Sequence, residues 1–209
     1  IASEGAGTVG DAKQPVRSSN LVLKLDANGV IEEVITLPAE VNARQSRFGL
    51  EGIAESDGRL IVVFQRAWGD EAAPRIGLYD LASRTWSFRF YPLDAVASPN
   101  KGWVGLSDIT ALGHDRFVVI ERDNQAGPDA RIKRLYRFDL AGTTDGQTVE
   151  KYLVRDLIDD LRRPAGSVAE KIEGLTRLPS GELLIVNDND GLDAGNGETT
   201  LMRVGKAGE

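Results

Sequence analysis

The chain has 209 residues, of which 41% are hydrophobic and 27% are charged, and its formal net charge is −7. A chain of this length can bury a core, and its acidic balance disfavours non-specific binding to nucleic acid or anionic membranes, which depends on basic patches. Because the chain has no cysteine, disulfides, thiolate nucleophiles and cysteine-ligated zinc are excluded.

The first 38 residues are predicted to hold three strands. Residues 19–38 read as a hairpin with Asn28 and Gly29 at its turn, and residues 1–5 look like the end of a preceding strand. These strands match the later part of a four-stranded unit, so the chain is expected to begin inside such a unit. The sequence shows no initiator methionine, signal peptide or transmembrane run, and we expect the beginning of the natural polypeptide to be missing.

A short pattern then occurs three times, at residues 50–66, 106–122 and 172–188. Each copy has an apolar, acidic, apolar tripeptide with a small residue, then a turn, then a dense β-branched run. Such internal similarity is typical of a solenoid or a propeller. Further strands are expected after the copies, at residues 75–86, 86–93, 134–146, 148–157 and 200–209.

Four antiparallel strands with turn residues between them form one blade of a β-propeller. We therefore predict an all-β fold, a partial β-propeller of about three blades in a single domain. Because a ring needs about 4 to 8 blades, another chain, a second copy or an absent N-terminal half is expected to complete it, and the chain is not expected to be a free monomer. The predicted parts are an incomplete blade at 1–38, blades at 50–93 and 106–157, and an incomplete blade at 172–209.

The only clear helix candidate spans residues 152–163 and ends at Pro164 and Gly166. It is expected to lie in a loop and to pack on the rim of the propeller. Its apolar positions at helical spacing are Leu153, Leu157, Ile158 and Leu161.

Acidic and amide side chains recur on the predicted inner strands. In a propeller the first strand of each blade lines the central channel, and Glu51, Asp108 and Glu173 lie on or beside that strand. An oxygen-rich site formed by several blades suits a hard cation such as Ca²⁺. The ends of the second strands add Glu4, Gln65, Glu121, Asn187 and Asp188, with Arg66 and Arg122 following two of them.

A structural interpretation of these residues stays open beside the functional one. Each recurring acid is also suited to accept backbone N–H groups from the neighbouring blade. Arg66 and Arg122 either pair with the acids between blades or face a phosphate or carboxylate ligand.

The loop at residues 187–198 is rich in oxygen ligands but does not follow the EF-hand pattern. It is either a solvated turn or a Ca²⁺ site formed by Asn187, Asp188, Asp190 and Asp193. The single histidine, His114, is expected in a hairpin turn, and a Ser/His/Asp triad is rejected because it would have to use this residue.

Several of these segments, in this order, resemble a known family. Residues 49–66, 105–124 and 171–190, together with Ala2–Gly5, are similar to the phytase-like propellers that are described as having esterase-like activity. The resemblance extends from Ile1 to about Val204. It implies a β-propeller that is secreted or periplasmic, hydrolyses phosphate esters and depends on Ca²⁺.

The resemblance also implies roles for particular residues. The implied catalytic residues are Glu51, Asp108, Glu121 and Glu173, and Arg66, Arg122 and Lys171 would balance the charge of a phosphate. Gln65 departs from the pattern, because the other blades have an acid or Asn at its position. The implied metal ligands are Glu4, Glu51, Asp108, Glu121, Glu173, Asn187 and Asp188.

Two other functions remain open at the level of sequence. A non-catalytic scaffold that binds a ligand or a protein would use the acids only as structural ties. A lactone or carboxyl-ester hydrolase would use Ca²⁺ to polarise a carbonyl group and would differ in the substrates it turns over.

Overall fold

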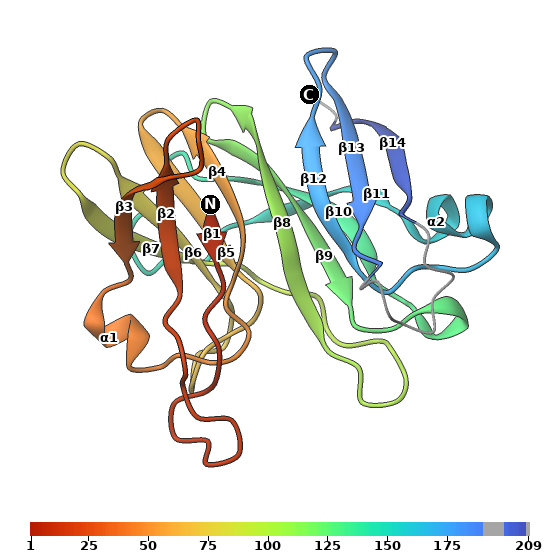
Figure 1. Cartoon of the computed structure of the whole chain (residues 1–209). Coiled ribbons are helices and arrows are strands. Elements are labelled where there is room, and N and C mark those ends of the chain that lie inside the picture. Colours follow the sequence, from red (N-terminus) through yellow and green to blue (C-terminus); the bar gives the residue numbers. More distant parts are fainter. Residues whose placement is uncertain (190–198, 208–209) are drawn as a thin grey trace. The chain divides into compact units, whose positions relative to one another are not determined.

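The computed structural model describes residues 1–189 and 199–207 (Figure 1). It is an all-β structure with four antiparallel sheets and few helices, as the sequence predicts. The chain divides into two compact units. The first comprises Ile1–Tyr91 and Thr143–Thr148, and the second comprises Pro92–Gly142 and Val149–Glu209. Within the described residues, no helix has the length and apolar character needed to cross a membrane.

The first sheet of the first unit has three strands in the order β1-β2-β3. Asp26 accepts the backbone N–H groups of Asn28 and Val30 at 2.8 Å, and Gly29 has a φ of 82°, so the predicted turn is confirmed. The elements here are β1 (Ala2–Ser3), β2 (Leu21–Leu25), β3 (Ile31–Thr36) and the short helix α1 (Ala39–Asn42).

The second sheet of this unit has four strands in the order β4-β5-β6-β7. Its outer edge at β7 is covered by residues 143–148, because Phe90 donates its backbone N–H to the carbonyl of Gln147 at 2.9 Å. Apolar residues of both sheets, among them Val22, Phe64 and Phe88, form one core, to which Trp68 of the loop after β5 also belongs. The strands are β4 (Leu50–Ser56), β5 (Arg59–Phe64), β6 (Arg75–Asp80) and β7 (Thr85–Phe90).

The second unit also combines a four-stranded sheet, in the order β11-β10-β9-β8, with a three-stranded sheet in the order β12-β13-β14. Ile120, Leu135 and Ile185 belong to the core that the two sheets share. His114, with a φ of 55°, lies in the turn between β8 and β9, as predicted. The elements are β8 (Val104–Gly113), β9 (Arg116–Asp123), the 3₁₀ helix η1 (Gly127–Asp129), β10 (Lys133–Asp139), β11 (Lys151–Asp156), β12 (Ile172–Arg177), β13 (Glu182–Asn187) and β14 (Leu201–Lys206).

The helix predicted over residues 152–163 begins later than the sequence indicates. Residues up to Asp156 belong to strand β11, in which Leu153 pairs with Tyr136 of β10, and only Ile158–Ala165 is helical (α2). Pairing with β10 therefore outweighs the helical spacing at the start of this segment. Leu157 and Leu161 are buried, whereas Leu153 is exposed.

One irregularity recurs in β4, β8 and β12 and places the polar residues. In each strand the register against its partner shifts by one residue, which leaves Glu51, Ser107 and Glu173 as the extra residue of a β-bulge. A bulge turns the extra side chain away from the regular alternation of the strand. The positions aligned in the sequence thus share a backbone feature as well.

Candidate functional site

The predicted site residues are distributed over both units, and each unit gathers its own polar cluster. The first unit contains Glu4, Glu51 and Arg66, and the second contains Asp108, Glu121, Arg122, Lys171, Glu173, Asn187 and Asp188.

Arg122, at the end of β9, is the centre of the cluster in the second unit. Its Nε donates to Oγ of Ser107 at 2.8 Å and its Nη2 forms an ion pair with Oε1 of Glu173. The two bulge residues of β8 and β12 therefore fix one guanidinium group. The Trp103 ring centroid lies 5.6 Å from the Arg122 Cζ.

One nitrogen of this guanidinium group has no hydrogen-bond partner among the described residues. Arg122 is only 3% exposed, and its Nη1 is buried with no hydrogen-bond partner among the described residues. An unpaired buried donor is costly, so a partner supplied from elsewhere would stabilise the site. Ser107 was not predicted as a site residue, although its alignment with Glu51 and Glu173 was available in the sequence.

Asp108 connects the two sheets of the second unit. Its Oδ1 accepts the N–H of Ile109 at 2.8 Å, and its Oδ2 accepts the N–H of Leu175, in β12, at 2.6 Å. Burial raises the pKa of Asp108 to about 6, although both hydrogen bonds oppose that rise. Both oxygens are thus engaged by backbone donors.

Glu121 is fully buried, and each of its two carboxylate oxygens also accepts a protein donor. Its Oε1 accepts the N–H of Asp94 at 2.7 Å, and its Oε2 pairs with Nζ of Lys151 at 2.7 Å. Burial raises the pKa of Glu121, and the bond from Lys151 opposes this effect. The side chain holds the segment that precedes β8 onto the sheet.

A buried ion pair between Lys133 and Asp123 was not predicted from the sequence. Lys133 is 0% exposed, and its Nζ donates to Asp123 Oδ1 at 3.0 Å and to the carbonyls of Asp123 and Glu170 at 2.7 Å. Burial lowers the pKa of Lys133 to about 8, against the effect of Asp123. Asp123 also accepts from Ser98 Oγ and from the N–H of Arg131 at 2.7 Å.

The remaining predicted residues of this unit lie at the start of β12 and the end of β13. Asn187 accepts the N–H of Thr200 through Oδ1 at 2.5 Å, and Asp188 donates its N–H to the carbonyl of Lys171 at 3.0 Å. The Asp188 side chain is exposed. Asp190 and Asp193, the other candidates in this loop, lie outside the described residues.

In the first unit the predicted acids also accept protein donors. Glu4 Oε1 accepts the N–H of Gly49 at 2.9 Å, and Glu51 Oε1 accepts from the side-chain amide of Gln65. Asn20, which is fully buried and was not predicted, accepts the N–H groups of Gly5 and Leu50, both at 3.0 Å. These bonds join the three-stranded sheet to β4.

Arg66, after β5, lies against an aromatic ring and a second arginine. The Cζ atoms of Arg47 and Arg66 lie 4.2 Å and 4.5 Å from the centroid of the Phe48 ring. The pKa of Arg66 is lowered, first by burial and then by the charge of Arg47.

A calcium site requires about six to eight oxygen ligands, usually including several carboxylates. Among residues 1–189 and 199–207, no group of three or more Asp, Glu or His side chains is arranged to hold a metal ion. The oxygens of Asp108 and Glu121 are occupied by N–H groups and a lysine, and Glu173 is paired with an arginine. The described residues of either unit taken by itself do not fit Ca²⁺.

Comparison with known proteins places the chain in a family. The family model for phytase-like proteins, described as esterase-like activity of phytase, matches residues 1–191. The chain belongs to this phytase-like family.

No curated protein matches the chain. Among solved structures, the chain is similar to the crystal structure of the major Malassezia sympodialis allergen Mala s 1, with 11% sequence identity and a TM-score of 0.43. The similarity covers 69% of this chain and 44% of the allergen, so this chain spans less than half the length of that protein.

Proposed function

We propose that the chain forms part of a β-propeller hydrolase that acts on phosphate esters. The family match supports a hydrolase-like β-propeller, and the sheets β4–β7 and β8–β11 have the four antiparallel strands of a propeller blade. In this proposal another polypeptide or a second copy completes the ring.

The proposal is supported by the hydrogen bonding of the Arg122 guanidinium group. Its guanidinium is held by Ser107 and Glu173, and its Nη1 has no partner among the described residues. A fixed guanidinium with a free donor is suited to a phosphoryl oxygen, because its charge and planar geometry match that group. Lys171, just before β12, is the second cation proposed to contact the phosphate.

In this proposal Glu173 is the acid best placed for proton transfer. It contacts Arg122, and its side chain is 24% exposed. It would take a proton from the attacking water as the new P–O bond forms and the ester P–O bond breaks. The proton would then pass to the leaving alkoxide. Asp108 and Glu121 would only hold the sheets in place.

Hydrolysis of 4-nitrophenyl phosphate tests the proposal, with Arg122→Gln compared with Arg203→Gln. Arg203 is an exposed arginine of β14 that pairs with Glu182 at 3.5 Å, so its removal controls for loss of positive charge. Arg122→Gln is expected to lower kcat/KM by about 10²-fold or more, the usual effect of losing one donor to transition-state charge, and Arg203→Gln to leave it unchanged.

Other substrates separate the alternatives. Turnover of 4-nitrophenyl acetate or a lactone without turnover of the phosphate ester would favour the carboxyl-ester hydrolase. No turnover of any of these substrates by the wild-type protein would overturn the proposed function and leave the scaffold.

A further inference from the structure

A loop of the second unit lies against the buried charges at the end of β9. This loop, residues 98–103, directly precedes β8 and is yellow-green in Figure 1. Ser98 donates its Oγ–H to Asp123, which is fully buried and follows Arg122 in the chain. The Trp103 ring centroid lies 5.6 Å from Cζ of Arg122, and Arg122 is only 3% exposed. The 98–103 loop therefore takes part in shielding the Arg122 guanidinium group from solvent.

The shielded guanidinium group carries an energetic cost. Its Nη1 is buried and has no hydrogen-bond partner among the described residues. Such a donor raises the free energy of the closed arrangement, because it has lost its water without gaining an acceptor. Movement of the 98–103 loop would let water or a ligand reach Nη1, so this cost favours an open arrangement.

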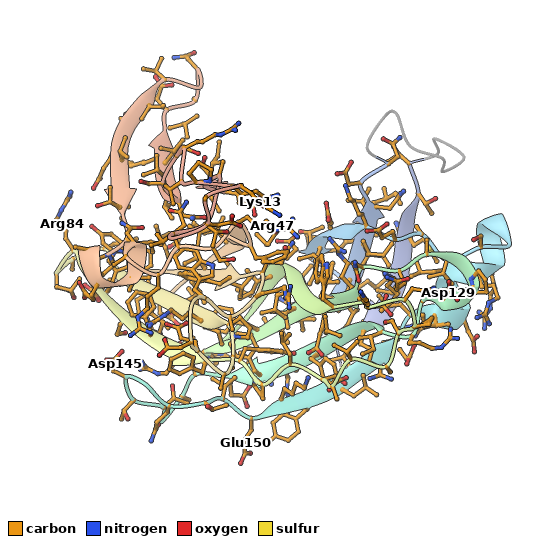
Figure 2. All side chains as sticks on the ribbon, turned by 90° about the horizontal axis from the view of Figure 1, so that it is seen from below. Lys13, Arg47, Arg84, Asp129, Asp145 and Glu150 are labelled. Carbon is orange, nitrogen blue, oxygen red and sulfur yellow. The ribbon has the colours of Figure 1, made fainter. Side chains whose placement is uncertain are left out.

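The 98–103 loop is held by hydrogen bonds at a few points. Trp103 donates its backbone N–H to Oδ1 of Asn124 at 2.7 Å and accepts the Asn124 N–H through its carbonyl at 3.1 Å. The side-chain amide of Asn100 donates to Oδ2 of Asp129 at 3.1 Å, at the surface of this unit (Figure 2). Residues 99–101 are exposed, and Trp103 is only partly buried. A segment with so little apolar burial opens at a lower free energy than a core strand.

The tip of this loop has a backbone conformation that is unfavourable for one of its residues. Asn100 and Lys101 are both left-handed, with φ angles of 60° and 58°, and Gly102 donates its N–H to the carbonyl of Pro99 at 3.2 Å. Two such residues in succession form a turn of the I′ kind, in which glycine rather than lysine is preferred at the second position. The closed loop thus has a local backbone cost, which is removed when the turn opens.

We propose that residues 98–103 form a lid that opens and closes over Arg122, with Trp103 as the group that covers the guanidinium. The hydrogen bonds of Ser98, Asn100 and Trp103 favour the closed state, whereas the unpaired Nη1 and the left-handed turn oppose it. Opposing contributions of this kind keep two states close in free energy, as a gating segment requires. The lid goes beyond the proposed function, because it controls access to Arg122 whether or not an ester is hydrolysed there.

The test is the rate at which phenylglyoxal, a reagent for accessible arginine side chains, modifies Arg122 in the full chain. Mass spectrometry of proteolytic peptides gives this rate, together with that of the exposed Arg203 as an internal control. Asn100→Asp places a second carboxylate opposite Asp129 at an exposed position, so it should open the lid without altering the core. Asn28→Asp, in the exposed turn between β2 and β3, is the matched control for the added charge.

A cross-link makes the opposite change. Because the chain has no cysteine, Asn100→Cys combined with Asp129→Cys introduces the only two thiols, and dibromobimane can join the loop to η1 through them. The same double variant before cross-linking is the reference for this measurement. Trp103→Ala, which removes the covering ring, is a second opening variant, and Asn100→Asp keeps the test decisive where Trp103→Ala does not fold.

Asn100→Asp should raise the rate at Arg122 about 10-fold, which corresponds to the loss of one hydrogen bond to a charged group. Trp103→Ala should raise it at least as much, and the cross-link should lower it by a similar factor. Asn28→Asp should leave it unchanged, and the rate at Arg203 should be the same in every form. Equal rates at Arg122 in the opened and cross-linked proteins overturn the lid. Parallel acceleration at Arg203 also overturns it, because the fold as a whole would then have loosened.

Discussion

The carboxylate of Asp108 accepts the backbone N–H of Leu175 at 2.6 Å, and so a residue predicted from the sequence as a metal ligand joins β8 to β12. The bond acts between two sheets that share one core. The structural interpretation of the acids, as acceptors of N–H groups from a neighbouring sheet, therefore describes this residue.

This arrangement predicts a pH dependence of stability. The pKa of Asp108 is about 6 in the folded chain, above the ordinary value of 3.8, so the folded chain binds this proton more tightly than the unfolded chain. As pH rises from about 4 to about 6, ionisation of Asp108 should lower the free energy of unfolding by on the order of 2 to 3 kcal/mol. Asp108→Asn should remove this contribution.

Urea denaturation of both proteins from pH 4 to pH 7 gives the difference between their free energies of unfolding. Asp159→Asn, at an exposed position of α2, serves as the control. A difference between wild type and Asp108→Asn that does not change with pH would contradict the assignment.

The ion pair of Lys133 should be essential for the stability of the second unit. Lys133→Met removes the donor to Asp123 and to the carbonyl of Glu170, and leaves the buried Asp123 carboxylate without its counter-ion. We expect a loss of about 3 to 5 kcal/mol in the free energy of unfolding. Lys206→Met, at an exposed position, should change it by less than about 0.5 kcal/mol. Equal effects of the two substitutions would show that the pair is not stabilising.

Asn20 has a corresponding position in the first unit. Asn20 directly precedes β2 and connects the end of β1, through Gly5, to β4 of the next sheet, through Leu50. Lys133, at the start of β10, likewise connects the end of β9 to the segment that precedes β12. Asn20→Ala leaves two backbone donors without their acceptor and should cost about 2 to 4 kcal/mol. Asn28→Ala, in an exposed turn, is the control, and thermal denaturation of both variants provides the comparison.

The state of association tests whether the ring is completed by a partner. If the chain is part of a propeller, the purified protein should form a dimer or a larger species, because incomplete blades leave apolar faces and strand edges uncovered. Light scattering coupled to size-exclusion chromatography measures the mass directly. A stable, monodisperse species of 22.6 kDa would refute this expectation.

The sequence predicts the strands well because their signals are local. The Asn28–Gly29 turn and the β-branched runs of β5, β9 and β13 depend on neighbouring residues alone. The boundary between β11 and α2 was missed because Leu153 fits helical spacing, and only pairing with Tyr136 shows that it belongs to a strand.

The candidate site was predicted less completely, because its contacts join distant parts of the chain. The acids were found from their recurrence, but their partners were not, since Arg122 and Glu173 are 51 positions apart. Nothing local distinguishes Lys133 from an exposed lysine in a strand. Its burial follows from the packing of β10 against the segment that precedes β12.

In this protein, the Arg122 side chain is expected to bind an oxyanion, while the recurring acids bind protein donors. The most direct test compares the melting temperature of the wild-type protein in millimolar phosphate, in millimolar CaCl₂ and in EDTA, at equal ionic strength. We expect phosphate to raise the melting temperature by mass action, and calcium and chelator to leave it within about 1 °C. A rise with calcium that Glu173→Ala abolishes, together with no response to phosphate, would contradict the account and restore the metal-binding interpretation of the acids.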